Sequence, residues 1–85
     1  MQMIYNSANY CIVEFPVESG QEALAFGGYE IVDKNYQREI FLGGNLAEQF
    51  RAKVRKLFED EPSTADIDAF LGQFDKLMMR PIIIH

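Results

Sequence analysis

The sequence predicts an α+β domain: an antiparallel sheet of about four strands, then a two-helix hairpin packed on one face, with a short C-terminal extended strand. Three observations lead to this fold class. Segments of strand-like character fill the first half of the chain, and segments with helical spacing fill the second half. Capping residues stand before both helical segments. A length of 85 residues accommodates one domain, which we expect to span residues 1–85.

Residues 2–6 and 10–16 read as the first two strands, joined by a turn at "NSAN". The second strand is apolar on both of its faces at Cys11, Ile12 and Val13, which is typical of a central strand. Residues 17–27 fit either a loop or a short helix, and the sequence leaves both open.

The best-defined hairpin is formed by residues 28–34 and 37–43. Only one pairing register gathers their apolar side chains on one face and their charged side chains mostly on the other. Pairing Ile31 with Ile40 and Asp33 with Arg38 places an opposite-charge pair beside the turn. One face then gathers Tyr29, Ile31, Ile40 and Leu42. The same register pairs Gly28 with Gly43 and Gly27 with Gly44. The connecting loop has two residues, Asn35-Tyr36, or four residues in the same register.

Two amphipathic helices are expected to follow the hairpin. The first spans about 46–59, with Asn45 as N-cap and Glu48 at capping-box spacing. Ser63 caps the second helix, with Asp66 at the matching position. The predicted buried stripe of the first helix is Leu46, Phe50, Val54, Leu57 and Phe58. The predicted buried face of the second is Ile67, Phe70, Leu71, Phe74, Leu77 and Met78.

The C-terminal "RPIIIH" is too apolar for a free tail. We expect Ile82 to Ile84 to pair as an extended strand, because β-branched residues favour extended backbone. Pairing on the edge of the same sheet and pairing with a second copy of the chain both remain open. The intrachain version is favoured because the helical hairpin can return the terminus to the sheet.

The stretch "EIFLGGNLAEQF" raises the question of a phosphate site, since glycines precede a helix start. It lacks the spaced glycines of a dinucleotide fold and the Gly-Lys-Ser/Thr of a P-loop. The preceding strand belongs to a hairpin, so we interpret the glycines as a structural corner.

No constellation of catalytic residues is visible, and we expect neither an enzyme nor a cofactor. Cys11 and His85 are the only thiol and imidazole, too few ligands for a structural zinc site. Cys11 lies in an apolar strand, where burial would raise its pKa and reduce its reactivity. The carboxylates lack calcium-loop spacing and are interpreted as solvated helix ends; they are Glu59, Asp60, Glu61, Asp66 and Asp68.

The charge distribution suggests one interaction patch. The net charge of −5 argues against a dedicated binder of nucleic acid or anionic membrane. Half of the basic residues nevertheless cluster within six positions, and they are Arg51, Lys53, Arg55 and Lys56. They form either a solvated helix face or a patch for phosphates or an acidic protein. The chain shows neither a signal peptide nor a spanning segment, so we expect a cytoplasmic protein that does not enter the membrane.

The strings "MQMIYNS", "NYC", "GGYEIVDK" and "REIFLGG" resemble those of a family of small uncharacterised proteobacterial proteins. The resemblance runs nearly end to end and implies a compact bacterial domain. The family has no assigned activity, cofactor or catalytic residue, so the resemblance implies no site residue. The hypothesis is therefore a non-enzymatic cytosolic interaction module, with a homodimer among its possible assemblies. The alternative is a nucleic-acid-associated protein that uses the basic face of the first helix.

Overall fold

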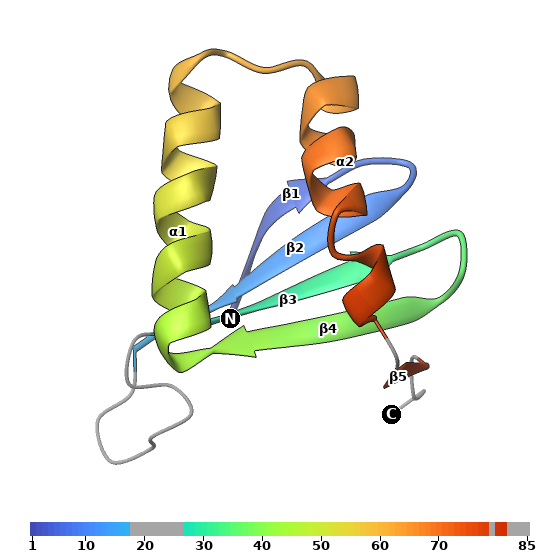
Figure 1. The fold of residues 1–85 in the computed structure, drawn as a ribbon, viewed down its shortest axis with the longest axis horizontal. Coiled ribbons are helices and arrows are strands. Elements are labelled where there is room, and N and C mark those ends of the chain that lie inside the picture. Colours follow the sequence, from blue (N-terminus) through green and yellow to red (C-terminus); the bar gives the residue numbers. More distant parts are fainter. Residues whose placement is uncertain (18–26, 79, 82–85) are drawn as a thin grey trace.

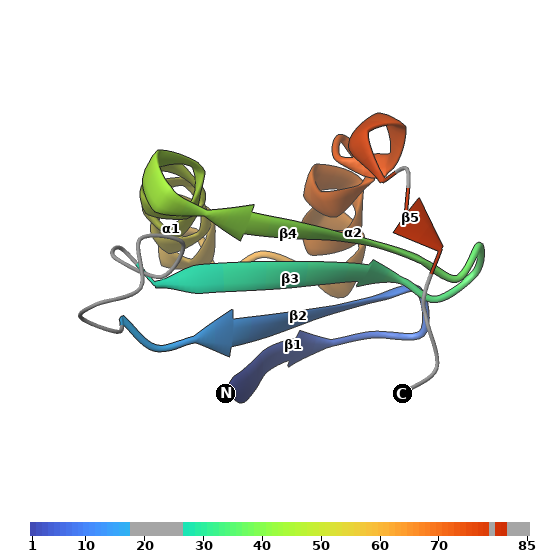
Figure 2. The same cartoon turned by 90° about the horizontal axis from the view of Figure 1, so that it is seen from below.

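The computed structural model describes residues 1–17, 27–78 and 80–81. A five-stranded sheet in the order β1-β2-β3-β4-β5, with every pair antiparallel, carries two helices on one face (Figures 1 and 2). The strands are β1 (Gln2–Asn6), β2 (Tyr10–Phe15), β3 (Gly28–Asp33), β4 (Arg38–Gly43) and β5 (Arg80–Pro81). The helices are α1 (Gly44–Glu59), α2 (Thr64–Gly72) and the short 3₁₀ helix η2 (Asp75–Leu77). The predicted α+β fold class is confirmed.

The register of the β3–β4 hairpin is the predicted one. Ile31 pairs with Ile40, Asp33 with Arg38 and Gly28 with Gly43. The loop is the four-residue alternative, 34–37, and Gln37 takes a left-handed backbone with φ of 52°. The Asp33 carboxylate stabilises this turn by accepting the backbone N–H groups of Asn35 and Tyr36 at 3.1 and 3.2 Å.

The start of α1 differs from the prediction. The helix follows β4 without a linker, its N-cap is Gly43, and no side chain caps it. Gly44 supplies the change of direction with φ of +58°, a left-handed conformation that glycine adopts at little cost. The predicted capping box of Asn45 and Glu48 is therefore wrong, because the helix begins before Asn45. The glycine pair does form a corner, between a strand and a helix.

The buried stripe of α1 is also rotated from the predicted one. Ala47, Phe50 and Val54 are its buried residues, whereas Leu46 and Phe58 are 58% and 38% exposed. The predicted stripe of large apolar residues left out Ala47, which is 0% exposed. The stripe therefore runs through a small residue that the hydrophobic pattern did not include.

The capping box of α2 is confirmed. The Ser63 side chain accepts the N–H of Asp66, and the Asp66 side chain accepts the N–H of Ser63. The helix ends at Gly72, earlier than predicted, and the chain continues through a turn into η2. Ile67, Leu71 and Met78 are buried as expected, but Leu77 is 59% exposed.

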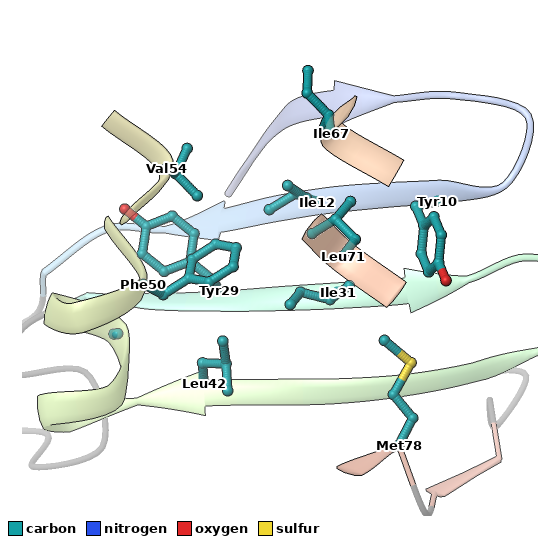
Figure 3. Packing of buried hydrophobic residues seen from close by; sticks show 11 residues of the cluster. Tyr10, Ile12, Tyr29, Ile31, Leu42, Phe50, Val54, Ile67, Leu71 and Met78 are labelled. Atoms are coloured by element: carbon teal, nitrogen blue, oxygen red, sulfur yellow. The ribbon is translucent and has the colours of Figure 1, made fainter. Parts of the chain in front are cut away.

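The core lies between the sheet and the two helices (Figure 3). Tyr29 and Ile31 of β3 are at most 1% exposed and lie beneath Phe50 and Leu71. The ring of Phe50 packs against those of Tyr29, Phe70 and Phe74, with centroids 5.0 to 6.0 Å apart. Such aromatic contacts add to the stabilisation from apolar burial and join both helices to the sheet.

The end of the chain returns to the sheet. Arg80 and Pro81 pair with Glu39 and Arg38, so β5 covers the edge of β4 within one chain. The predicted pairing of Ile82 to Ile84 lies outside the described residues. The alternatives for residues 17–27 also fall almost entirely outside them, since only Val17 and Gly27 are described.

Candidate interaction surfaces

The predicted basic patch is divided in the structure. Lys53, Arg55 and Lys56 are exposed on α1. Arg51 is half-buried, and its Nε donates to the Tyr29 hydroxyl at 2.9 Å, with the guanidinium 5.6 Å from the ring centroid. The Tyr29 hydroxyl in turn donates to Glu14 at 2.7 Å. Arg51 therefore anchors α1 to β2 and β3, and three of the four predicted cations remain exposed to solvent.

A second polar cluster joins α2 to the β1–β2 hairpin, and the sequence analysis missed it. Asp68 accepts from the Tyr5 hydroxyl at 2.8 Å, from Ser7 Oγ at 2.9 Å and from Asn9 Nδ2 at 3.0 Å. Burial works to raise the pKa of Asp68, but these three hydrogen bonds outweigh it and hold the pKa below its ordinary value. Tyr5 and Asp68 are 63 positions apart, and no local pattern marks such a pair.

Tyr10 extends this cluster, since its hydroxyl donates to the Asp75 carboxylate at 2.9 Å. Burial, followed by the hydrogen bond to Asp75, raises the pKa of Tyr10 to about 12. A phenol that holds its proton so firmly is a structural donor and a poor general base at neutral pH. Two of the carboxylates predicted at helix ends therefore have different structural roles. Asp66 belongs to a capping box, and Asp68 accepts hydrogen bonds from Tyr5, Ser7 and Asn9.

Cys11 is buried on β2, and burial raises the pKa of its thiol. A raised pKa lowers the fraction of thiolate, the reactive form of cysteine, at neutral pH. His85, the other member of the thiol–imidazole pair, lies outside the described residues. Within 1–17, 27–78 and 80–81, no three acidic, histidine or cysteine side chains gather in a way that could hold a metal ion.

The face of the sheet opposite the helices is unexpectedly apolar. Cross-strand pairing forms one row of Met3, Val13, Glu30 and Phe41, and a next row of Asn6, Cys11, Val32 and Glu39. Phe15 belongs to the same face and meets Phe41 with ring centroids 5.8 Å apart. Met3 is 56% exposed and Phe41 40% exposed. We call this set the outer sheet face: Met3, Cys11, Val13, Phe15, Val32 and Phe41.

A hollow of about 70 Å³ opens on the helix side of the molecule, between the first half of α1, β4 and the turn before η2. Its lining is Leu42, Leu46, Gln49, Phe50, Lys53 and Phe74. Pockets for drug-sized ligands usually measure ~300–1,000 Å³, so the hollow suits one side chain better than a cofactor. Lys53 is the one member of the predicted basic patch that lines it.

The helices in the described part of the chain are all too short or too polar to cross a membrane.

Comparison with known proteins places the chain in a family. Residues 1–85 match the model of a family described as a protein of unknown function, DUF3567. A protein of Burkholderia thailandensis, named Protein BTH_I0359, is 60% identical over 85 residues, which is the whole of both chains. No solved structure gives a significant match. The end-to-end match shows that this chain belongs to the DUF3567 family.

Proposed function

We propose that this protein is a non-enzymatic, cytoplasmic interaction module that binds another protein through its outer sheet face. The observation that carries the proposal is the composition of that face. A sheet covered by helices on one side ordinarily alternates apolar residues inward with polar residues outward. Here six outward positions on β1 to β4 are apolar or cysteine instead.

The exposure of this face supports a recognition role. Val13, Phe15 and Val32 are half-buried, and Phe41 and Met3 are substantially exposed. The ring contact of Phe15 with Phe41 joins the apolar residues of β2 and β4, while Glu30 of β3 lies between Val13 and Phe41. Contiguous apolar patches on small domains are typical of binding surfaces. Glu30 and Glu39 lie within the same face and give it polar positions beside the apolar ones. We propose another protein as the occupant, and self-association is one outcome of the test.

Site-specific photo-crosslinking in the native cytoplasm tests the proposal. A photoreactive phenylalanine analogue at Phe41 is expected to form one dominant adduct with another protein, whereas the same analogue at the exposed Glu59, at the far end of α1, is not. Adding Val13→Ser should remove the Phe41 adduct and leave the fold intact. Equal adducts at both positions would contradict the proposal, and an adduct at twice the chain mass would replace it with self-association.

The exposed cations on α1 favour nucleic-acid association as the second candidate. Lys53, Arg55 and Lys56 face solvent, although Arg51 is engaged with Tyr29. If phosphates bind there, the Lys53→Gln, Arg55→Gln, Lys56→Gln variant should lose affinity for mixed DNA and RNA, together with the salt dependence. The absence of detectable binding by the native protein at low salt would end this candidate.

A further inference from the structure

We propose that the hollow beside α1 is an anchor site for one large apolar side chain carried by an acidic protein segment. This surface lies on the helix side of the molecule, opposite the outer sheet face. The inference is therefore independent of the binding proposed for the outer sheet face, and it competes with the nucleic-acid candidate for Lys53 and Lys56.

The walls of the hollow are suited to an apolar side chain. Leu42 and Phe50, both labelled in Figure 3, form its base and are 4% and 2% exposed. Phe74 and Leu46 also line the hollow. A volume of about 70 Å³ with mostly apolar walls favours one aliphatic or aromatic side chain, as in helix-in-groove recognition.

Leu46 marks the mouth of the hollow. It follows the helical spacing of the apolar stripe of α1, yet it is 58% exposed. A side chain seated in the hollow would cover part of Leu46 and remove its apolar area from water, which favours binding.

The charges beside the hollow select an acidic segment. Gln49, Lys53 and Lys56 follow one another on the same side of α1, at spacings of four and three residues. Lys53 lines the hollow itself. Both lysines are exposed, and neither forms an ion pair with the part of the chain that the structure describes. Carboxylates on either side of an apolar anchor would meet these cations.

The experiment uses ¹⁵N-labelled protein and a synthetic helical peptide of about 16 residues, rich in Ala and Glu, with one central Phe. Chemical-shift changes are expected at the amides of Leu46, Gln49, Lys53 and Phe74. A peptide with Ala in place of Phe should not bind. A peptide with Gln in place of Glu should bind about fivefold to tenfold more weakly, because the charge attraction is lost.

Two leucines of nearly equal exposure provide the matched control. Leu46→Asp should weaken peptide binding by about tenfold or more, because it places a carboxylate at the mouth of an anchor site. Leu77→Asp changes a residue that is 59% exposed on η2 and does not line the hollow, so binding should stay unchanged. Melting curves establish that both variants fold.

Three results would overturn the inference: no shifts at the lining amides with millimolar peptide, equal loss for Leu46→Asp and Leu77→Asp, or full binding of the Gln peptide. Phe41→Ser on the outer sheet face should bind the peptide as the native protein does. If the peptide does not bind the hollow, the proposal for the outer sheet face is unaffected. If no partner binds the outer sheet face, the proposal for the hollow is likewise unaffected.

Discussion

The guanidinium of Arg51 lies so close to Gly27 that a β-carbon added there would stand 2.8 Å from Nη2. It would also stand 3.1 Å from the carbonyl oxygen of Phe15. Gly27 has φ of +79°, a conformation that costs other residues roughly 1–2 kcal/mol. Glycine is thus required here for its backbone conformation and for the space that Arg51 fills.

Substituting the two left-handed glycines separates these requirements. Gly44→Ala should lower the free energy of unfolding by about 1 kcal/mol through backbone strain alone, since nothing lies within 4 Å of the new β-carbon. Gly27→Ala should cost more, because Arg51 must also move. Chemical denaturation measures both values. An equal cost for the two variants would show that the approach of Arg51 to Gly27 is energetically unimportant.

Asp33 is the buried charge of the β3–β4 hairpin, at 2% exposure, and it forms an ion pair with Arg38 at 2.8 Å. Asp33→Ala should destabilise the fold by about 2–4 kcal/mol, because it leaves Arg38 and two turn amides without their acceptor. Asp33→Asn retains an oxygen for the turn amides and should cost less. Urea titration tests this order, and a larger loss for Asn than for Ala would contradict it.

At the scale of elements, the two helices begin in different ways although their sequences look alike. Both starts offer a capping residue and an acid three positions later, at Asn45 with Glu48 and at Ser63 with Asp66. Only the second pair forms a capping box, because α1 begins directly at the end of a strand. A cap requires extended backbone before the helix, and Asn45 is already inside α1.

The two caps make a matched pair of substitutions. Ser63→Ala should destabilise the protein by about 1 kcal/mol, the usual cost of losing an N-cap hydrogen bond. Asn45→Ala should be close to neutral, since its side chain forms no cap bond. Thermal denaturation compares the two variants. A similar loss for both would indicate that Asn45 caps α1 in solution.

At the scale of the whole molecule, the two layers are held together by the aromatic core and by polar contacts at the sheet's turn end. Asp68 of α2 joins three residues of the β1–β2 hairpin, and Asp75 at the start of η2 accepts from Tyr10. The first hairpin and the second helix are distant in sequence, so these bonds connect parts of the chain that only the tertiary fold brings together.

This arrangement predicts acid sensitivity. Since the pKa of Asp68 is lowered on folding, the carboxylate contributes stability above its ordinary pKa of about 4, and that contribution is lost as the pH falls through the folded-state pKa. Asp68→Asn should be about 1 kcal/mol less stable than the native protein at pH 7. The difference should close below pH ~4. A constant difference from pH 7 to pH 3 would exclude a charged Asp68 as its source.

Much of the architecture is determined by local pattern. The hairpin register follows from alternation in β3 and β4, because any shift by one residue moves apolar side chains to the wrong face. The α2 cap follows from Ser63 and Asp66, whose bonds are local. The burial of Cys11 follows from the apolar run around it. Each of these depends on neighbours that are close in the sequence or directly paired.

The tertiary structure alone decided the rest. Arg51 is separated from the predicted basic patch because the sheet places the Tyr29 hydroxyl, which itself donates to Glu14, within hydrogen-bond distance of its guanidinium. Leu46 lines a hollow because the helix turns Ala47, and not Leu46, toward the sheet. Asp68 links α2 to the β1–β2 hairpin because the fold brings these two elements, distant in sequence, into contact. Hydrophobic periodicity specifies which face of an element turns inward, but the rotation of a helix and the partners of a long side chain depend on packing between layers.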